Sequence, residues 1–248
     1  MKRVGLIVVV ALLIAAEPEY YGDISDLKLN KPEDKEDVKS TPPPKQAIIL
    51  FDGKSLDNWT KTDGKTEAPW KLVAGGAMEA KSGNINTKEK FDGSFKLHVE
   101  FRVPYMPKAT GQGRGNSGVY VQGRYEVQVL DSYGLKSKDN DCGAIYEVAA
   151  PLVNACKAPT VWQSYDIEYW APTCKDGKKS ESARMTVFQN GVKIQDKTRL
   201  ARTKDGKEEI VTNTRAGMGG DPCSPGPILL QDHGNPVQFR NIWLLPLK

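Results

Sequence analysis

The stretch of sequence that decides the fold is NSGVYVQGRYEVQVLD, residues 116–131. Apolar and polar side chains alternate along both of its halves, which is the period-two pattern of a β-strand that buries one face. The two halves meet near Gly123 and Arg124, so the stretch predicts a β-hairpin.

The register of this hairpin follows from which residues share a face. A two-residue loop at 123–124 would set Val121 opposite Glu126 and mix apolar with charged side chains. An odd-numbered connection, such as residues 123–125 with a bulge, separates the two faces cleanly. We therefore predict one face of Val119, Val121, Val127 and Val129, and another of Tyr120, Gln122, Glu126 and Gln128 with Asn116 at its end.

The polar face predicts a ligand surface. Its carboxylate and amides can hydrogen-bond sugar hydroxyls, and its aromatic ring can stack on the C–H face of a sugar. A strand face that only meets solvent would more often carry Lys, Thr and Glu. Asp131 falls on the valine side by parity, so it either lies just beyond the strand or follows a second bulge.

Other segments repeat the strand pattern. Residues 95–103 alternate Phe, Leu and Val with charged or polar residues, and Asn190-Gly191 between two alternating runs predicts a type I′ hairpin turn. Many short strands separated by Gly, Pro, Asn and Asp indicate an all-β sandwich or barrel of two antiparallel sheets.

The N-terminus has a different composition. Residues 1–16, with Lys2 and Arg3 before an apolar run, predict a signal peptide and export to the periplasm or beyond the cell. An uncleaved interfacial anchor is the alternative. Residues 17–46 are acidic, lysine-rich and proline-bearing, and they predict a disordered tether, unless Tyr20 and Tyr21 pack as a short strand. Residues 47–248 then form a single domain.

Charge and cysteine content narrow the choice of partners. The net charge is +4, but basic and acidic residues are interspersed, which disfavours nucleic-acid binding. Export makes disulfides the default for the four cysteines, and of three possible pairings we favour Cys142–Cys156 with Cys174–Cys223. A zinc site is disfavoured because C-x-x-C spacing is missing and only 2 His occur. The oligomeric state stays open.

Four further motifs accompany the hairpin: CGAIY at 142–146, APLVNA at 150–155, WQSYDIE at 162–168 and QDHGNPVQFRNI at 231–242. Together with the hairpin they closely resemble the 3-keto-disaccharide hydrolase family, also described as 3-keto-glycoside lyases or hydratases. The resemblance covers about residues 48–247. It implies a concanavalin-like jelly-roll sandwich with a concave ligand face, and a glycoside substrate already oxidised to a ketone at C3.

The resemblance implies cleavage of the glycosidic bond by abstraction of the C2 proton and elimination of the C1 substituent, followed by hydration. This route needs a base, a stabiliser of negative charge on oxygen and an acid. We expect Glu126 as base or acid, His233 as its proton-transfer partner and Arg240 as the stabiliser. The substrate-binding set that we expect is Asn116, Tyr120, Gln122, Gln128, Asp131, Tyr146 and Gln231.

Structural roles compete with these assignments. His233 can simply cap its Gly-Asn-Pro turn, and Arg240 can be the buried partner of a structural carboxylate. His98 is expected to be exposed on an ordinary strand. Asp166 and Glu168 share a face and either join the site or remain solvated.

Two other functions fit the same sequence. One is a non-catalytic, lectin-like carbohydrate-binding domain. The other is a conventional sandwich-fold glucanase, since Glu126, Gln128 and Asp131 resemble the Glu-x-Asp-x-x-Glu signature, although the central acid is missing here. Glu147 stands where a small residue is expected and affects the pocket rim.

No cofactor is expected. A divalent cation such as calcium is the alternative, because Asp131, Asp139, Asn140 and Asp141 supply hard oxygen ligands within one loop.

Overall fold

A computed structural model of the protein describes residues 19–205 and 207–247. The predicted signal peptide at 1–16 lies outside the described residues. Among those residues, no helix is long and apolar enough to cross a membrane.

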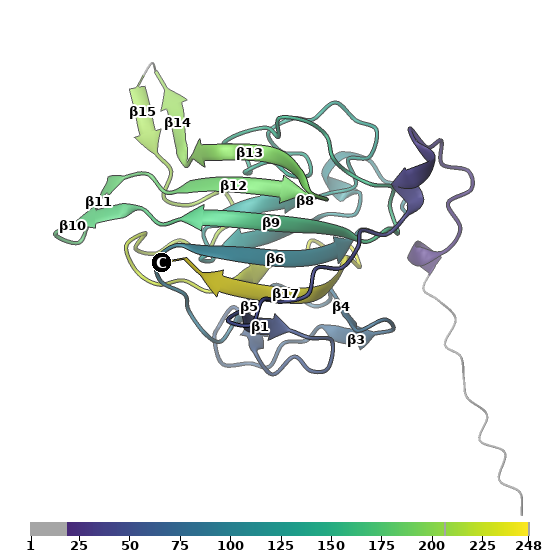
Figure 1. Ribbon diagram of the computed structural model, residues 1–248, viewed down its shortest axis with the longest axis horizontal. Coiled ribbons are helices and arrows are strands. Elements are labelled where there is room, and N and C mark those ends of the chain that lie inside the picture. Colours follow the sequence, from purple (N-terminus) through teal and green to yellow (C-terminus); the bar gives the residue numbers. More distant parts are fainter. Residues whose placement is uncertain (1–18, 206, 248) are drawn as a thin grey trace, which may run out of the picture.

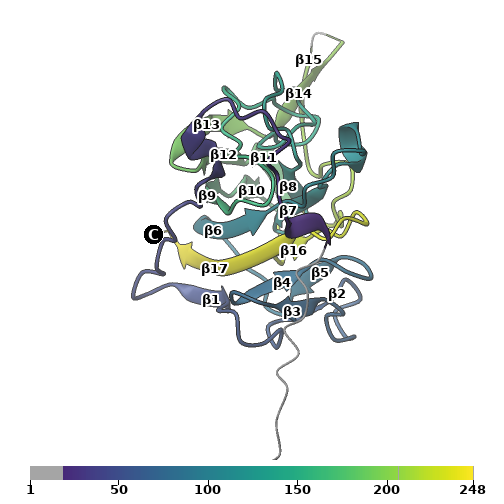
Figure 2. The ribbon, with the colours of Figure 1, turned by 90° about the vertical axis from the view of Figure 1, so that its right-hand side faces the viewer.

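The domain is a sandwich of two antiparallel sheets, which confirms the predicted all-β fold (Figures 1 and 2). The larger sheet has 8 strands in the order β13-β12-β9-β6-β17-β4-β3, and β1 also pairs with β17. Its strands are β1 (Ile48–Phe51), β3 (Lys71–Val73), β4 (Ala77–Glu79), β6 (Phe95–Arg102), β9 (Gln163–Trp170), β12 (Arg184–Gln189), β13 (Val192–Arg199) and β17 (Gln238–Pro246).

The smaller sheet lies behind the larger one in Figure 1 and has 5 strands in the order β2-β5-β16-β7-β8. Its strands are β2 (Trp59–Lys61), β5 (Ile85–Thr87), β16 (Leu229–Leu230), β7 (Ser117–Val121) and β8 (Tyr125–Val129). Two separate hairpins, β10 (Thr173–Lys175) with β11 (Lys178–Glu181) and β14 (Ala201–Lys204) with β15 (Lys207–Ile210), project from the sandwich. The short 3₁₀ helices are η1 (Glu19–Tyr21), η2 (Pro32–Lys35) and η3 (Gly111–Gly113).

The decisive hairpin is β7–β8, and its connection has the predicted odd number of residues. Val119 pairs with Val127 and Tyr120 pairs with Glu126, so residues 122–124 form the loop. Gln122 and Gly123 both have positive φ, of 51° and 64°, which lets the chain reverse in three residues. The loop lies one residue earlier than the predicted 123–125, yet the parity is the same and the two faces separate.

The valine face of this hairpin belongs to the core between the sheets. The valines at 119, 121, 127 and 129 are fully buried and pack in one hydrophobic cluster with residues of the larger sheet such as Phe101 and Tyr165. The polar face therefore points away from the core, on the outer side of the smaller sheet.

The segment predicted to be a disordered tether packs against the sandwich instead. Tyr21 is buried, and its hydroxyl donates to the carbonyl oxygens of Arg102 and Pro236. Residues 37–41 then cross β6 and β17 on the way to β1 (Figure 1). Within this segment, the Val38 N–H donates to the Trp162 carbonyl. The prediction of disorder was based on the low content of hydrophobic residues in this segment. A few individual contacts hold the segment on the sandwich, and composition does not reveal such contacts. We call residues 37–41 the strap.

One of the two predicted disulfides is present. Cys174 in β10 is bonded to Cys223, which lies in the loop after β15. The predicted Cys142–Cys156 bond is wrong for this structure, in which both are thiols. The buried Cys142 sulfur lies 3.1 Å from the Tyr165 hydroxyl, and the Gln189 amide approaches both sulfurs, so the two thiols are satisfied as polar groups.

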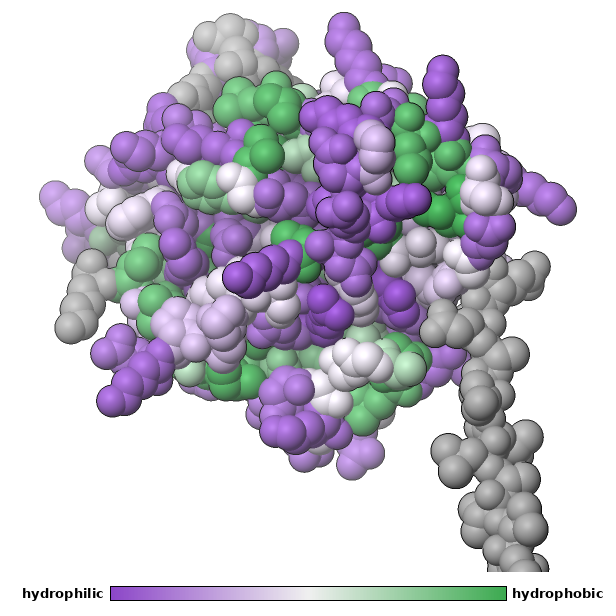
Figure 3. Space-filling model, turned by 45° about the vertical axis from the view of Figure 1, so that its right-hand side comes forward, coloured by the Kyte–Doolittle hydropathy of each residue, from purple (hydrophilic) through white to green (hydrophobic). Residues whose placement is uncertain are grey.

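Hydrophilic side chains dominate the face of the molecule in Figure 3, and apolar patches lie scattered between them. In this view, polar and apolar side chains are therefore mixed over the described surface, which agrees with the interspersed charges of the sequence.

Candidate active site

The polar face of the β7–β8 hairpin forms the floor of a pocket of about 390 Å³. Loops on either side of the hairpin form its walls. The pocket is lined by Gln112, Asn116, Glu126, Gln128, Tyr146, Arg215, Ala216, Gln231 and His233. Six of the ten residues predicted for the site line this pocket: Asn116, Glu126, Gln128, Tyr146, Gln231 and His233.

Glu126 forms part of this floor and is 2% exposed. Its side chain passes over Gly118 on the neighbouring strand, where any larger residue would collide with it. Burial raises the pKa of the Glu126 carboxyl to about 7; the Tyr120 hydroxyl, hydrogen-bonded to it, opposes that rise, and the charge of Glu147 adds to it. The group can therefore take or give a proton near neutral pH.

Tyr120 supports Glu126 from beside it. Its hydroxyl accepts a hydrogen bond from Gln231 Nε2 at 3.0 Å and donates to the Glu126 carboxylate. Burial raises the pKa of Tyr120 far above its ordinary value, so the phenol stays a neutral donor. Tyr120 is thus placed under the carboxylate and not on the pocket wall.

Three amide side chains also line the pocket. Gln112 Oε1 accepts from Gln128 Nε2 at 2.9 Å and from Asn116 Nδ2 at 3.3 Å. These bonds leave Gln128 Oε1 and Asn116 Oδ1 buried and without a partner. Because buried polar groups in proteins are nearly always paired, two unpaired acceptors side by side indicate a ligand that brings hydroxyl donors.

The mouth of the pocket carries the cationic and titratable groups. Arg215 lies there on a loop, and its Nη1 contacts Glu147 Oε1 at 3.1 Å. Tyr146 lines the same wall, and burial followed by the charges of Glu147 and Glu126 raises the pKa of its hydroxyl. His233 is exposed at the rim. The Glu147 side chain thus shapes the rim through its ion pair with Arg215.

Sequence reasoning missed Gln112, Arg215 and Ala216. Gln112 sits four residues before Asn116 in a glycine-rich run, a spacing that the alternation of the hairpin does not reach. Residues 215 and 216 lie in an irregular loop without any periodicity, and only the fold brings this loop over the hairpin. No pattern in the sequence indicates that Gln112 or residues 215 and 216 lie next to the hairpin.

Besides Tyr120, two predicted substrate-binding residues do not line the pocket. Gln122 is in the β7–β8 loop, where its Oε1 accepts from Arg124 Nη1 and from the Tyr169 hydroxyl. Asp131 lies just beyond β8, as its parity required, and its carboxylate pairs with Arg114 at 3.2 Å. Both side chains are buried in structural contacts.

Arg240 also lies away from Glu126, on β17 of the larger sheet. Its Nε donates to Glu100 Oε2 at 2.7 Å and its guanidinium stacks 4.1 Å over the ring of Trp162. This contact is the structural alternative anticipated for Arg240, a partner for a buried carboxylate. The pocket with Glu126 takes its cation from Arg215 instead.

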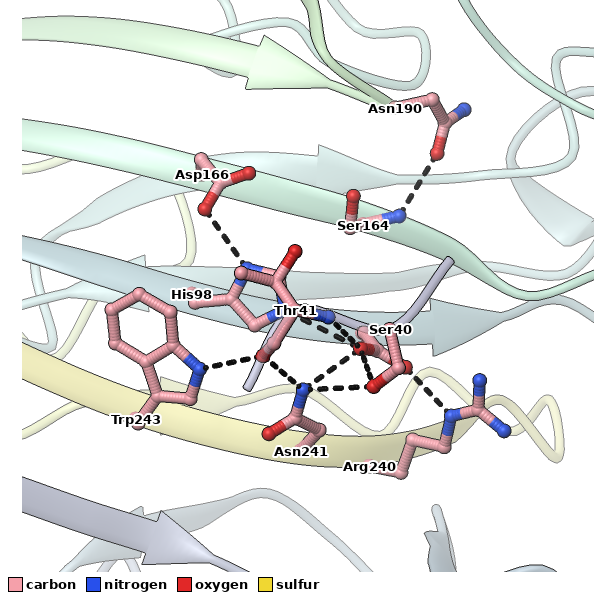
Figure 4. A network of polar contacts seen from close by, with 10 residues as sticks. Ser40, Thr41, His98, Ser164, Asp166, Asn190, Arg240, Asn241 and Trp243 are labelled. Carbon is pink, nitrogen blue, oxygen red and sulfur yellow. Dashed lines mark hydrogen bonds and ion pairs between the residues drawn. The ribbon is translucent and has the colours of Figure 1, made fainter. Parts of the chain in front are cut away.

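Figure 4 shows the network around Arg240. Glu100 also accepts from Ser40 and Asn241, and His98 lies between it and Asp166, with His98 Nδ1 2.9 Å from Asp166. The expectation of an exposed His98 is wrong, because the strap covers β6 and leaves the imidazole 0% exposed and stacked on Trp243.

Three of the four residues suggested as cation ligands hold other partners. Asp131 pairs with Arg114, the Asp141 carboxylate accepts from Lys138 N–H, and the Asn140 carbonyl accepts from Gln112. Among the described residues, no group of three or more His, Cys, Asp or Glu side chains is arranged to hold a metal ion.

The pocket thus combines a carboxyl group of raised pKa with unpaired amide acceptors on the outer face of a β-sandwich, which are groups suited to binding a polyhydroxylated ligand. The chain belongs to the family of 3-keto-alpha-glucoside-1,2-lyase-like domains, whose model matches residues 46–245. This match places it among glycosyl hydrolase-like, carbohydrate-active enzymes. None of the curated proteins matches this chain.

Three crystal structures of candidate glycosyl hydrolases from Parabacteroides distasonis are similar to it. One has a TM-score of 0.69 and 36% sequence identity, and the match covers 88% of this chain and 97% of that one. A second has a TM-score of 0.56 and 18% identity over 82% and 94% of the two chains. A third has a TM-score of 0.54 and 23% identity over 81% and 99%. The last two show a shared fold.

Proposed function

We propose that the protein cleaves the glycosidic bond of 3-keto-glycosides, including 3-keto-disaccharides, by elimination followed by hydration. The observation that carries the proposal is the lone carboxylate of the pocket. Glu126 is the single Asp or Glu among the lining residues within the described part of the chain, and its pKa is about 7. A retaining glycosidase needs two carboxyl groups about 5–5.5 Å apart, whereas an elimination needs one base.

The proposed reaction has two steps. The C3 ketone acidifies the C2 proton, a base removes that proton, and the electron pair forms an enediolate. The pair then moves to form a C1=C2 double bond, the ketone is restored, and the C1 oxygen leaves with its electron pair and takes a proton. Water finally adds its hydroxyl to C1 and a proton to C2, so the net reaction is hydrolysis.

Glu126 is the proposed base. Its desolvated carboxylate is poised near neutral pH, and the Tyr120 hydroxyl holds it in place. The unpaired Gln128 and Asn116 oxygens are proposed to accept hydrogen bonds from sugar hydroxyls and so fix C2 over the base.

Arg215 and Tyr146 are proposed to stabilise the negative oxygen of the enediolate, because both line the pocket and can donate hydrogen bonds. His233 is proposed as the proton donor to the departing oxygen, since it lines the pocket and lies exposed at its rim, where solvent can return a proton to it. Arg240 has no part in this version of the mechanism.

The test uses a 3-keto-disaccharide prepared with a separate sugar oxidase. We expect the wild type to release a free sugar from it and to leave the unoxidised disaccharide intact. Glu126→Gln should lose about 10²–10⁴-fold in kcat, which is the usual contribution of general-base catalysis. Glu181→Gln, an exposed residue of β11, is the matched control and should keep full activity.

Heavy water separates the possible routes. In D₂O, elimination and hydration place deuterium at C2 of the product, whereas direct hydrolysis leaves C2 unlabelled. Cleavage without C2 deuterium would overturn the elimination route. Cleavage of the unoxidised sugar would identify a conventional glucanase, and binding without cleavage of either sugar would identify a lectin.

A further inference from the structure

The amide side chains of Gln112, Asn116 and Gln128 line the pocket together and are joined by hydrogen bonds. Gln112 lies in η3, in the loop between β6 and β7, and Gln128 lies in β8. An amide has one oxygen that accepts hydrogen bonds and one nitrogen that donates them. The way each amide faces therefore decides whether the pocket offers a ligand acceptors or donors.

The orientation of the Gln112 amide is fixed by a group that can only accept. Its Nε2 donates to the Asn140 carbonyl oxygen at 2.8 Å. A reversed amide would set two oxygens against each other, because a carbonyl has no hydrogen to give. Gln112 Oε1 therefore faces its other neighbours, Asn116 and Gln128.

Gln112 Oε1 in turn orients those two amides. It accepts from Gln128 Nε2 at 2.9 Å and from Asn116 Nδ2 at 3.3 Å. Both nitrogens thus point to Gln112, and Gln128 Oε1 and Asn116 Oδ1 are left buried without a partner among the described residues. Since buried polar atoms are nearly always paired, these oxygens are acceptors held ready for a ligand.

Gln128 depends on the Gln112 side chain more than Asn116 does. The shortest bond of Asn116 Nδ2, of 2.7 Å, goes to the backbone carbonyl of Gln112, which no substitution of that side chain removes. Gln128 Nε2 has its shortest bond with Gln112 Oε1, and its second, to the Asn140 carbonyl, is 3.3 Å long. Gln128 and Glu126 also lie two residues apart on β8 and so share a face.

We propose that Gln112 is a positioning residue that makes this part of the pocket select hydrogen-bond donors. It holds Gln128 Oε1 toward the substrate, so that a hydroxyl of the oxidised ring binds there and the ketone oxygen is excluded. This inference rests on the proposed function. A ketone oxygen only accepts, so beside Gln128 Oε1 it would meet another acceptor. The ketone is left to the donors of the pocket, Arg215 and Tyr146.

Deoxyfluoro substrates test the requirement for a donor, because fluorine is close to a hydroxyl in size and donates no hydrogen bond. The substrates are methyl 3-keto-glucoside and its analogues with fluorine in place of the hydroxyl at C2, C4 or C6. The readout is KM for each analogue divided by KM for the parent compound. Comparing this ratio between the wild type and a variant cancels the chemical differences between the substrates.

Three variants are compared with the wild type. Gln112→Leu removes both the acceptor for Gln128 and the bond to Asn140. Gln112→Glu is the conservative variant, since its carboxyl group accepts from Gln128 in either protonation state. Thr110→Val is the control, because Thr110 is exposed in the same loop, does not line the pocket and has no capping bond from its side chain.

We expect at least one fluoro analogue to have a KM about tenfold above that of the parent in the wild type, the effect of losing one hydrogen bond. In Gln112→Leu the Gln128 amide can turn, so this ratio should fall to about threefold or less. Gln112→Glu and Thr110→Val should keep the wild-type ratio. A pocket that is merely damaged would raise KM for every substrate alike and leave the ratio unchanged.

Two results would overturn the inference while the proposed function stands, because the parent compound is still cleaved in both. One is a wild type whose KM is the same for the parent and for all three analogues. The other is a Gln112→Leu variant that keeps the wild-type ratio.

A wild type that cleaves none of these substrates would remove the proposed function, and the orientation of the amides is then tested without a ligand. Neutron diffraction from crystals of the deuterated protein shows which atom of each amide carries deuterium. Gln128 with its nitrogen toward residue 112 in the wild type, and turned in Gln112→Leu, supports the positioning role. The same orientation in both proteins, or an oxygen toward Gln112 in the wild type, overturns it.

Discussion

Gly118 lies so close to Glu126 that a β-carbon at residue 118 would stand 2.5 Å from Glu126 Oε1. The two residues lie on adjacent strands of the same hairpin, and this contact lets the carboxylate lie flat on the sheet. The backbone φ of Gly118 is not positive, so the glycine is required by space and not by conformation.

Gly118→Ala should therefore displace the carboxylate and lower kcat on 3-keto-glycosides by at least about tenfold, with a stability loss of about 1–3 kcal/mol from overpacking. The control is Gly113→Ala, where a β-carbon meets nothing within 4 Å and φ is not positive. Activity and urea unfolding of the two variants check the prediction, and full activity of Gly118→Ala would contradict it.

The pKa of Glu126 predicts the pH dependence of the reaction. If Glu126 is the base, kcat/KM rises with pH through a limb near pH 7, because the ionised form is active. The Tyr120 hydroxyl lowers the pKa of Glu126 and the Glu147 charge raises it. Tyr120→Phe should move the limb to higher pH and Glu147→Gln to lower pH, and shifts in the opposite directions would disprove the assignment.

Alternation predicted the hairpin and its polar face because a one-residue slip would have buried charged groups. The pairing of Val119 with Val127 follows from that single constraint. The same reasoning could not assign Arg215 to the site or remove Arg240 from it. The position of Arg215 depends on a loop, and that of Arg240 on a strand, that lies far from the hairpin in the sequence. No local sequence pattern shows which distant segments pack against the hairpin.

The buried His98 shows a second reason why the sequence pattern alone did not predict the structure. Its strand alternates like any half-exposed strand, but the strap covers the polar face of β6 and buries the imidazole. The prediction of a disordered N-terminal segment and the prediction of an exposed His98 thus failed for one reason, the strap. Hydrogen bonds to a few side chains hold it, and composition does not report them.

The Cys174–Cys223 disulfide should stabilise the loop that carries Arg215 and Ala216 over the pocket of Glu126. It closes a segment of 49 residues, for which the chain-entropy model gives about 4 kcal/mol. Cys174→Ser with Cys223→Ser should lower Tm and raise KM for 3-keto-glycosides more than it changes kcat. A dithiothreitol titration of the wild type checks the same effect, and an unchanged Tm in both experiments would refute it.

Glu100 should hold the strap in place. It is fully buried, and although burial opposes its ionisation, its bonds to His98, Ser40, Asn241 and Arg240 lower its pKa to about 2. Glu100→Gln leaves buried cationic groups without their counter-ion and should cost about 3–5 kcal/mol. Protease cleavage near residues 37–41 should accelerate in Glu100→Gln and not in Glu168→Gln, whose carboxylate forms a half-exposed pair with Lys96.

The two arginines separate catalysis from stability. Arg215 lines the pocket with an exposed side chain, so Arg215→Ala should leave unfolding within about 0.5 kcal/mol of the wild type and lower kcat by about 10²-fold or more, as expected for the loss of a donor to a developing negative charge. Arg240→Ala removes the ion pair with the buried Glu100, which lies on the neighbouring strand of the larger sheet. It should destabilise the fold by about 3 kcal/mol and leave kcat of the folded protein unchanged. Measurements of kcat and of urea unfolding for both variants show which arginine acts in catalysis. If Arg240 were the catalytic arginine, Arg240→Ala would lower kcat and Arg215→Ala would not.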